Sequence, residues 1–159
     1  MNWQQLAATS HYQTAVSVAE TLAAGDVADA SAGLQELIDA VARSERRALR
    51  SQLIRLMAHI LKWLAQPDQR TPSWSLSIYQ AREEIAGIQD EVPSLNREAI
   101  EDIWDTCLQA AKKQAQAETQ QPIKTATLGW DEVFHQDYFV ARVETKSSRK
   151  DRRRSANGR

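Results

Sequence analysis

The side chains best suited to chemistry lie between residues 45 and 82. Glu45 and His59 are fourteen positions apart in the sequence. On one continuous helix that separation amounts to about 21 Å, so the two groups cannot act on the same substrate atom. A turn at residues 66–73 would instead bring His59 opposite Tyr79 and Arg82 on the next helix. The sequence therefore predicts a polar cluster of His59, Tyr79 and Arg82.

This cluster admits two interpretations. An enzyme would use it for acid–base catalysis, which requires a base within hydrogen-bond reach of the proton it removes. In the structural interpretation, which we favour, His59 is a neutral interface residue and Arg82 pairs with a carboxylate across the helices. The candidates for ligand binding or interaction in this region are His59, Trp63, Arg70, Trp74, Tyr79, Arg82 and Glu45.

Glu45 has a second possible role. The same hairpin geometry places it near residues 93–95, where a later helix would begin with unpaired backbone N–H groups and a positive dipole end. We predict that Glu45 caps that helix from a distance and does not act as a general base.

Metal and cofactor sites find little support in the residue pattern. His11, His59 and His135 fall in separate predicted elements, and no glycine-rich phosphate loop is present. Cys107 lies on an apolar stripe, where a cysteine ordinarily serves as a small buried hydrophobe. We therefore predict no metal, no cofactor and no catalytic residue.

Two groups of cations are candidates for phosphate contacts. The first is Arg43, Arg46, Arg47 and Arg50 on the second predicted helix, and the second includes Arg152, Arg153 and Arg154. The segment 146–159 has seven Lys or Arg against one Asp, a net +6, which leaves about −7 on the rest of the chain. Because this segment has no large apolar residue, it is predicted to be a flexible tail.

Composition limits the class of protein. A chain of 159 residues with 42% hydrophobic side chains suits one domain with a true core, and 5 Gly and 4 Pro favour helices over turn-rich β structure. No basic region followed by an apolar run opens the chain, and charged residues interrupt its most apolar segment, residues 53–65. We expect neither secretion nor a membrane span. The single cysteine fits a reducing compartment, so we expect a cytoplasmic protein.

Helical periodicity accounts for most of the chain. It predicts a first helix over residues 3–24, with a possible break near Ser10 and His11, and a second from about Ser31 to Gln66. A third follows the turn, capped by Thr71, and ends at Pro93. Ser94 is the predicted cap of a fourth helix that runs to about residue 121, and residues 130–139 add a short helix or apolar arm.

The apolar stripe of the second helix shifts along its length. At ~100° per residue, the early stripe centres on Leu34, Ile38 and Val41, and the later stripe, on Leu53, Ile60 and Leu64, lies about a quarter turn away. The helix must therefore change partners or bend near residues 43–50.

These elements predict an all-α fold. Four main helices joined by short loops should pack as an antiparallel bundle, with the short C-terminal element laid over it. The predicted organisation is a helical bundle domain over residues 1–140 and a flexible basic tail over residues 141–159.

Several segments together resemble a known family. They are Ser44-Glu45-Arg46-Arg47, Met57-Ala58-His59-Ile60-Leu61-Lys62-Trp63, Arg70-Thr71-Pro72-Ser73-Trp74 and Pro93-Ser94-Leu95, with Arg82 and Ala117-Glu118-Thr119. Their order and spacing are similar to the bacterial family named domain of unknown function 29, over roughly residues 12–139. The resemblance implies an all-helical fold and no established activity. The sequence departs from the family pattern around residues 10–12 and after Pro122.

Three functions remain open at this point. The leading hypothesis is a non-enzymatic helical module that binds protein, either a second copy or another chain, because the helical signals are consistent and no catalytic set converges. The alternative is nucleic-acid binding through the Arg43 to Arg50 face and the basic tail. The third is an enzyme with its site at His59, Tyr79 and Arg82. The sequence does not define the oligomeric state.

Overall fold

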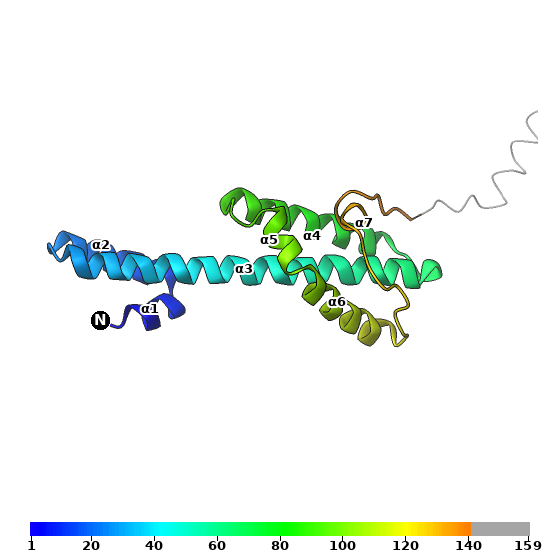
Figure 1. Cartoon of the computed structure of the whole chain (residues 1–159), viewed down its shortest axis with the longest axis horizontal. Helices are drawn as coiled ribbons and strands as arrows, with labels where there is room; N and C mark the ends of the chain where they lie inside the picture. Colours follow the sequence, from blue (N-terminus) through cyan, green and yellow to red (C-terminus); the bar gives the residue numbers. More distant parts are fainter. Residues whose placement is uncertain (141–159) are drawn as a thin grey trace, which may run out of the picture.

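One long helix organises the molecule. A computed structural model describes residues 1–140, and in it the other helices lie along α3 (Val27–Ala65) (Figure 1). With 39 residues, α3 is about 58 Å long at 1.5 Å per residue. Residues 1–140 contain helices and no strands, which confirms the all-helical prediction. The predicted basic tail, residues 141–159, lies outside the described residues.

Local capping signals explain where the first helices begin. The break predicted near Ser10 is confirmed, since α1 (Trp3–Thr9) and α2 (His11–Ala23) meet there and the Ser10 side chain accepts a hydrogen bond from the Gln13 N–H at 3.2 Å. The predicted start of α3 near Ser31 is wrong. The chain turns at Gly25, which has a φ of 89°, and the Asp26 carboxylate accepts from the Asp29 N–H at 3.1 Å. Asp26 therefore starts α3 one turn earlier.

The turn after α3 agrees with its sequence signals. A short 3₁₀ turn, η1 (Pro67–Gln69), leads to α4 (Pro72–Glu91), and the Thr71 hydroxyl accepts from the Trp74 N–H at 3.3 Å. The N-cap predicted at Thr71 is confirmed, with Pro72 in the first helical turn, where its missing N–H costs nothing.

The fourth predicted helix differs from expectation in two ways. It is divided into α5 (Arg97–Asp102) and α6 (Trp104–Thr119) at Ile103. Its N-cap is Asn96, whose side chain accepts from the Ala99 N–H at 3.1 Å, so the cap predicted at Ser94 is wrong. The cap is also local, and within residues 1–140 no hydrogen bond joins the half-buried Glu45 to the start of this helix. The distant cap predicted for Glu45 is therefore not formed.

The short helix predicted near the end of the described chain is present as α7 (Trp130–Phe134). The Glu132 carboxylate accepts from the Gly129 N–H at 3.0 Å and fixes its first turn. Because α7 packs on α3, the chain after α6 returns across the molecule to the long helix (Figure 1).

The long helix has different partners at its two ends. Its first half contacts α1 and α2, and its second half contacts α4 and α6, so the predicted change of partners is confirmed (Figure 1). The predicted antiparallel bundle of four main helices is not confirmed, since the helices form two sets along one continuous rod. Within residues 1–140, no helix is both long and apolar enough to cross a membrane.

The two sets are packed very differently. Buried side chains from Leu49 onward form one cluster that includes Leu53, Leu56, Ile60 and Ile78, all without exposed surface. The N-terminal set, which we call the arm, consists of α1, α2 and residues 27–48 of α3. Its buried residues are Trp3, Ala7, Thr14, Ala30, Gly33 and Ala40, of which only Trp3 is large. The arm therefore has little hydrophobic core of its own.

Candidate functional site

The structure divides the cluster predicted from the sequence. Tyr79 and Arg82 lie together, with the Arg82 guanidinium 5.5 Å from the centre of the Tyr79 ring. In the described part of the chain no hydrogen bond or ion pair joins either of them to His59. Of the three residues predicted to form the cluster, Tyr79 and Arg82 therefore lie together and His59 does not join them.

Arg82 holds the end of α7. Its guanidinium donates to the carbonyl oxygens of Val133 and Gln136, both at 2.8 Å, and more weakly to that of Glu132 at 3.4 Å. Carbonyl groups in the last turn of a helix have no partner within it and carry partial negative charge, so the half-buried Arg82 guanidinium suits them. Burial lowers the pKa of Arg82 from its ordinary value. The predicted pairing of Arg82 with a carboxylate is thus replaced by pairing with backbone.

Tyr138 is at the centre of the same contacts, although sequence reasoning gave it no role. Its hydroxyl donates to the Glu132 carbonyl at 2.7 Å, and its N–H donates to the Tyr79 hydroxyl at 3.2 Å. Its carbonyl accepts from the buried Ser75 hydroxyl, and its ring lies edge-on to Trp63 at 5.8 Å. Burial raises the pKa of Tyr138 to about 12, so the phenol remains a hydrogen-bond donor at neutral pH.

The remaining aromatic candidates also have structural contacts. Trp63 is buried, and the Arg70 guanidinium lies 4.8 Å from its ring centre while donating to the Trp63 carbonyl at 2.9 Å. Lys62 lies 5.2 Å from the ring of Trp74 and forms a 2.7 Å ion pair with Glu118, which joins α3 to α6. Trp63 and Trp74 therefore help to join elements of this chain to one another.

His59 is half-buried on α3, near charged groups other than those predicted. Its Nδ1 lies 2.9 Å from the Arg55 carbonyl oxygen. Because a carbonyl only accepts, Nδ1 carries the proton in this contact. Burial lowers the pKa of His59 below its usual 6.5, with Lys62 acting in the same direction and Glu118 opposing it. A neutral His59 with one hydrogen bond agrees with the structural interpretation of the sequence.

The arm presents a surface that its own helices leave bare. Leu34, Ile38 and Val41 are 47%, 52% and 37% exposed. Their spacing of four and three residues places them on one face of α3. This is the early apolar stripe of the sequence, and in the described chain no helix covers it. We call it the α3 stripe.

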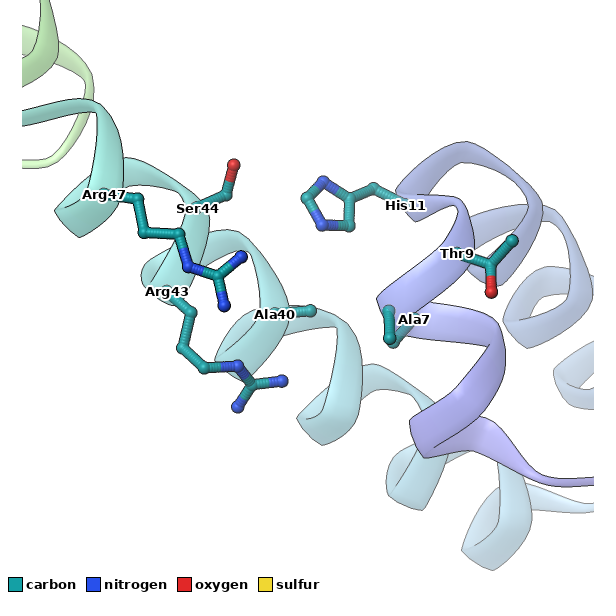
Figure 2. Close-up of a pocket in the computed structure, with 8 residues that line it drawn as sticks. Ala7, Thr9, His11, Ala40, Arg43, Ser44 and Arg47 are labelled. Atoms are coloured by element: carbon teal, nitrogen blue, oxygen red, sulfur yellow. The ribbon is translucent and has the colours of Figure 1, made fainter. Parts of the chain in front are cut away.

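A second feature of the arm is a polar cleft between the α1–α2 junction and α3. It has a volume of about 340 Å³ and is lined by Ala7, Ala8, Thr9, His11, Ala40, Arg43, Ser44 and Arg47. In Figure 2 the His11 imidazole extends from the start of α2 toward Ser44, and the guanidinium groups of Arg43 and Arg47 extend from α3. His11 is a candidate only for a metal site in the sequence, because nothing in the residue pattern places α1 and α2 beside residue 43.

Other parts of the predicted site have ordinary surroundings. Cys107 is buried, and burial raises the pKa of its thiol, which opposes nucleophilic use. Within residues 1–140 no three His, Cys, Asp or Glu side chains converge in a way that could hold a metal ion. Arg43, Arg46, Arg47 and Arg50 are all exposed, and Arg152, Arg153 and Arg154 lie outside the described residues.

Comparison with known proteins identifies a family but no individual relative. No curated protein and no solved structure matches the chain. A family model, described as Domain of unknown function DUF29, matches residues 8–139, which confirms the resemblance inferred from the sequence segments. The chain therefore belongs to the DUF29 family, a family without an assigned function.

Proposed function

We propose that the protein is a non-enzymatic helical module that binds an amphipathic helix of a partner protein on the α3 stripe. The observation that carries the proposal is the exposure of Leu34, Ile38 and Val41 on one face of α3. Scattered exposed apolar residues are normal on protein surfaces, but a row at helical spacing is the pattern by which one helix recognises another.

The position of the stripe supports this function. Farther along the same helix, Leu53, Leu56 and Ile60 are fully buried against α4 and α6, whereas no helix of the described chain covers the α3 stripe. The arm itself buries mainly small side chains, so its own packing contributes little apolar burial. A partner that covers the stripe would bury additional apolar surface and stabilise the arm. A partner helix would extend apolar packing from the core toward the N-terminus of α3.

The two other functions have less support. Nucleic-acid binding is favoured by four exposed arginines within residues 43–50, but residues 1–42 contain five Asp or Glu and no Lys or Arg. A long polyanion that follows the arm would therefore meet negative charge. The enzyme hypothesis loses support because Tyr79 and Arg82 bind backbone groups of residues 132–138.

The proposal also includes the compartment of the protein and the limits of its binding domain. A cytoplasmic location is supported by the lone buried Cys107, since disulfides are rare in that compartment. We take residues 1–140 as the binding domain and residues 141–159 as a separate basic tail, supported by its sequence of small polar and basic residues.

The proposal is tested by placing a charge in the stripe. We expect Ile38→Asp to abolish association, because a carboxylate buried against an apolar partner costs several kcal/mol. Leu76→Asp is the matched control, since Leu76 is similarly exposed, at 56%, on α4 and away from the arm. Circular dichroism should show the same helix content for both variants and for the parent chain.

Association is measured in two ways with the full chain. Light scattering coupled to size-exclusion chromatography reports a second copy as a mass twice 17.9 kDa. Capture from the native cell extract, followed by mass spectrometry, reports a different partner. In either case the partner should be lost with Ile38→Asp and kept with Leu76→Asp. If Ile38→Asp retains every partner that the parent chain binds, the α3 stripe is not the binding surface.

A further inference from the structure

Four of the five arginines of α3 form a concentration of like charge. Arg43, Arg46, Arg47 and Arg50 follow one another at steps of three, one and three residues, which places them on one side of the helix, and all four are exposed. Like charges four residues apart destabilise a helix. Within residues 1–140 none of these four side chains forms an ion pair with a carboxylate of the chain.

Only two of these arginines line the polar cleft. Arg43 and Arg47 contribute to its wall together with His11 and Ser44, whereas Arg46 and Arg50 do not. No Asp or Glu is among the lining residues, although the chain has 21 of them. The cleft therefore combines two guanidinium groups, an imidazole and a hydroxyl with no competing negative charge (Figure 2).

We propose that this cleft binds the phosphate group of a small phosphate ester. Two arginines offer planar sets of N–H donors that match phosphate oxygens, and the Ser44 hydroxyl and His11 imidazole can complete the coordination of an oxyanion. A cavity of about 340 Å³ is at the lower end of the range for small-molecule sites, so it suits a phosphate with a modest organic group.

The surrounding charge favours a small ligand over a nucleic acid. Residues 1–42, which include the whole α1–α2 side of the cleft, have no Lys or Arg and carry five carboxylates. A nucleic acid strand would extend past the two arginines across this acidic surface, whereas a single phosphate ester would contact only the cleft.

This ligand site does not rest on the proposed helix-binding surface. At ~100° per residue, the centre of the four arginines lies roughly 160° around α3 from the α3 stripe. The two surfaces are therefore on nearly opposite sides of the helix, and each can be present without the other.

The test is isothermal titration calorimetry on the full chain with inorganic phosphate, AMP, ATP and a single-stranded oligonucleotide as probes. The cleft variant is Arg43→Gln with Arg47→Gln, and the matched control is Arg46→Gln with Arg50→Gln. Both lose two positive charges from the same side of α3. We expect the cleft pair to weaken nucleotide binding by about tenfold or more, since charge-assisted hydrogen bonds are lost, and the control pair by less than about twofold.

Several outcomes would overturn the inference. Equal weakening by the two pairs would show diffuse attraction with no cleft site. Tighter binding of the oligonucleotide than of either nucleotide, with a steep salt dependence, would assign the arginines to nucleic acid. The absence of heat with every probe at millimolar concentration, together with no rise in the melting temperature in the presence of the same probes, would show that the cleft binds no phosphate. Thermal melts without ligand should show both variants at least as stable as the parent, since each removes one repulsive pair of arginines four residues apart, so that a loss of binding reports the site and not the fold.

Discussion

Gly33 is the residue of α3 on which the Trp3 ring packs. A Cβ at this position would lie 2.7 Å from ring atoms of Trp3, whose indole N–H also donates to the Asp29 carboxylate at 2.7 Å. The indole is rigid and held by this hydrogen bond, so it cannot easily move aside. The absence of a side chain at Gly33 is therefore what allows α1 to lie against α3.

We predict that Gly33→Ala destabilises the protein by about 1–3 kcal/mol through overpacking. Gly87→Ala is the control, because Gly87 lies in α4 and a Cβ there has no neighbour within 4 Å. There alanine should stabilise the helix by about 0.5–1 kcal/mol. Urea denaturation of the two variants measures both effects, and a destabilisation of equal size at the two positions would contradict the packing of Trp3 on Gly33.

His59 should make stability depend on pH. Its folded-state pKa is lowered by burial, so between pH 6.5 and that lower value the unfolded chain binds more protons than the folded chain. Stability is therefore complete above pH 6.5 and decreases as the pH falls through this window. Glu118, whose pKa is lowered first by its hydrogen bond with Lys62, acts in the same direction at lower pH, below its ordinary 4.5.

The corresponding measurement is a series of denaturation curves from pH 8 to pH 5. We predict that His59→Gln shows a shallower loss of stability than the parent chain as the pH falls from 6.5. The slopes of the two proteins should agree above pH 7.5, where the imidazole is neutral in both the folded and the unfolded state. Parallel curves over the whole range would mean that His59 titrates equally in both states.

At the scale of elements, Arg82 joins α4 to the last segment of the described chain. We predict that Arg82→Gln destabilises the fold by about 2–4 kcal/mol, because it leaves carbonyl groups at the end of α7 without their charged donor. Arg82→Lys should recover part of this loss, since it keeps the charge and loses the guanidinium fork.

Hydrogen exchange distinguishes a local loss of the Arg82 contacts with residues 132–136 from a general loss of stability. Hydrogen exchange should increase first in residues 130–140 of the Arg82→Gln protein, while amides of α3 near Ile60 remain protected. If exchange increases uniformly instead, Arg82 is part of the common core and does not hold one segment.

Elements with strong local signals were the predictable ones. Ser10, Thr71 and Pro72 each act within one helical turn, so their roles follow from the sequence alone. Asn96 and Ser94 are both residues that can cap a helix, and Asn96 caps this one, directly after the buried Leu95. Tyr138 bonds to Ser75 across 63 positions, and no spacing rule reports such a contact. The sequence predicts that Tyr79 and Arg82 lie together, but it does not show that residues 132–138 are their partners or that His59 lies apart from them.

At the scale of the whole molecule, the arm buries fewer large apolar side chains than the core formed from Leu49 onward. We predict that amides of α1 and α2 exchange faster than those around Leu56 and Leu61 in the isolated chain, because the arm buries few large side chains. Hydrogen–deuterium exchange with mass spectrometry measures the difference. If a second copy occupies the α3 stripe, protection of the arm should decrease on dilution, while that of the core should not.

The arrangement of the molecule also could not be deduced from periodicity. Helical spacing correctly indicates that α3 changes partners, but it does not show that Leu34, Ile38 and Val41 remain bare. The prediction of an antiparallel bundle assumed that every apolar stripe is covered by a sequence neighbour. Here two short helices cover another face of α3, centred on Gly33 and Ala40, and leave the stripe exposed.

Because α3 is continuous between Ala40 and Leu49, it fixes the rotation of the arm about the helix axis relative to the core. Removal of one residue there would rotate everything before it by about 100° around the helix axis and shift it by 1.5 Å. The α3 stripe would then point in a different direction relative to the core. Insertion of seven residues would leave a rotation of only about 20° but would lengthen the rod by about two turns. Length changes in this segment should therefore be restricted to near-whole numbers of helical turns, such as about seven or about eleven residues, whereas a loop such as residues 120–129 has no such periodicity to preserve.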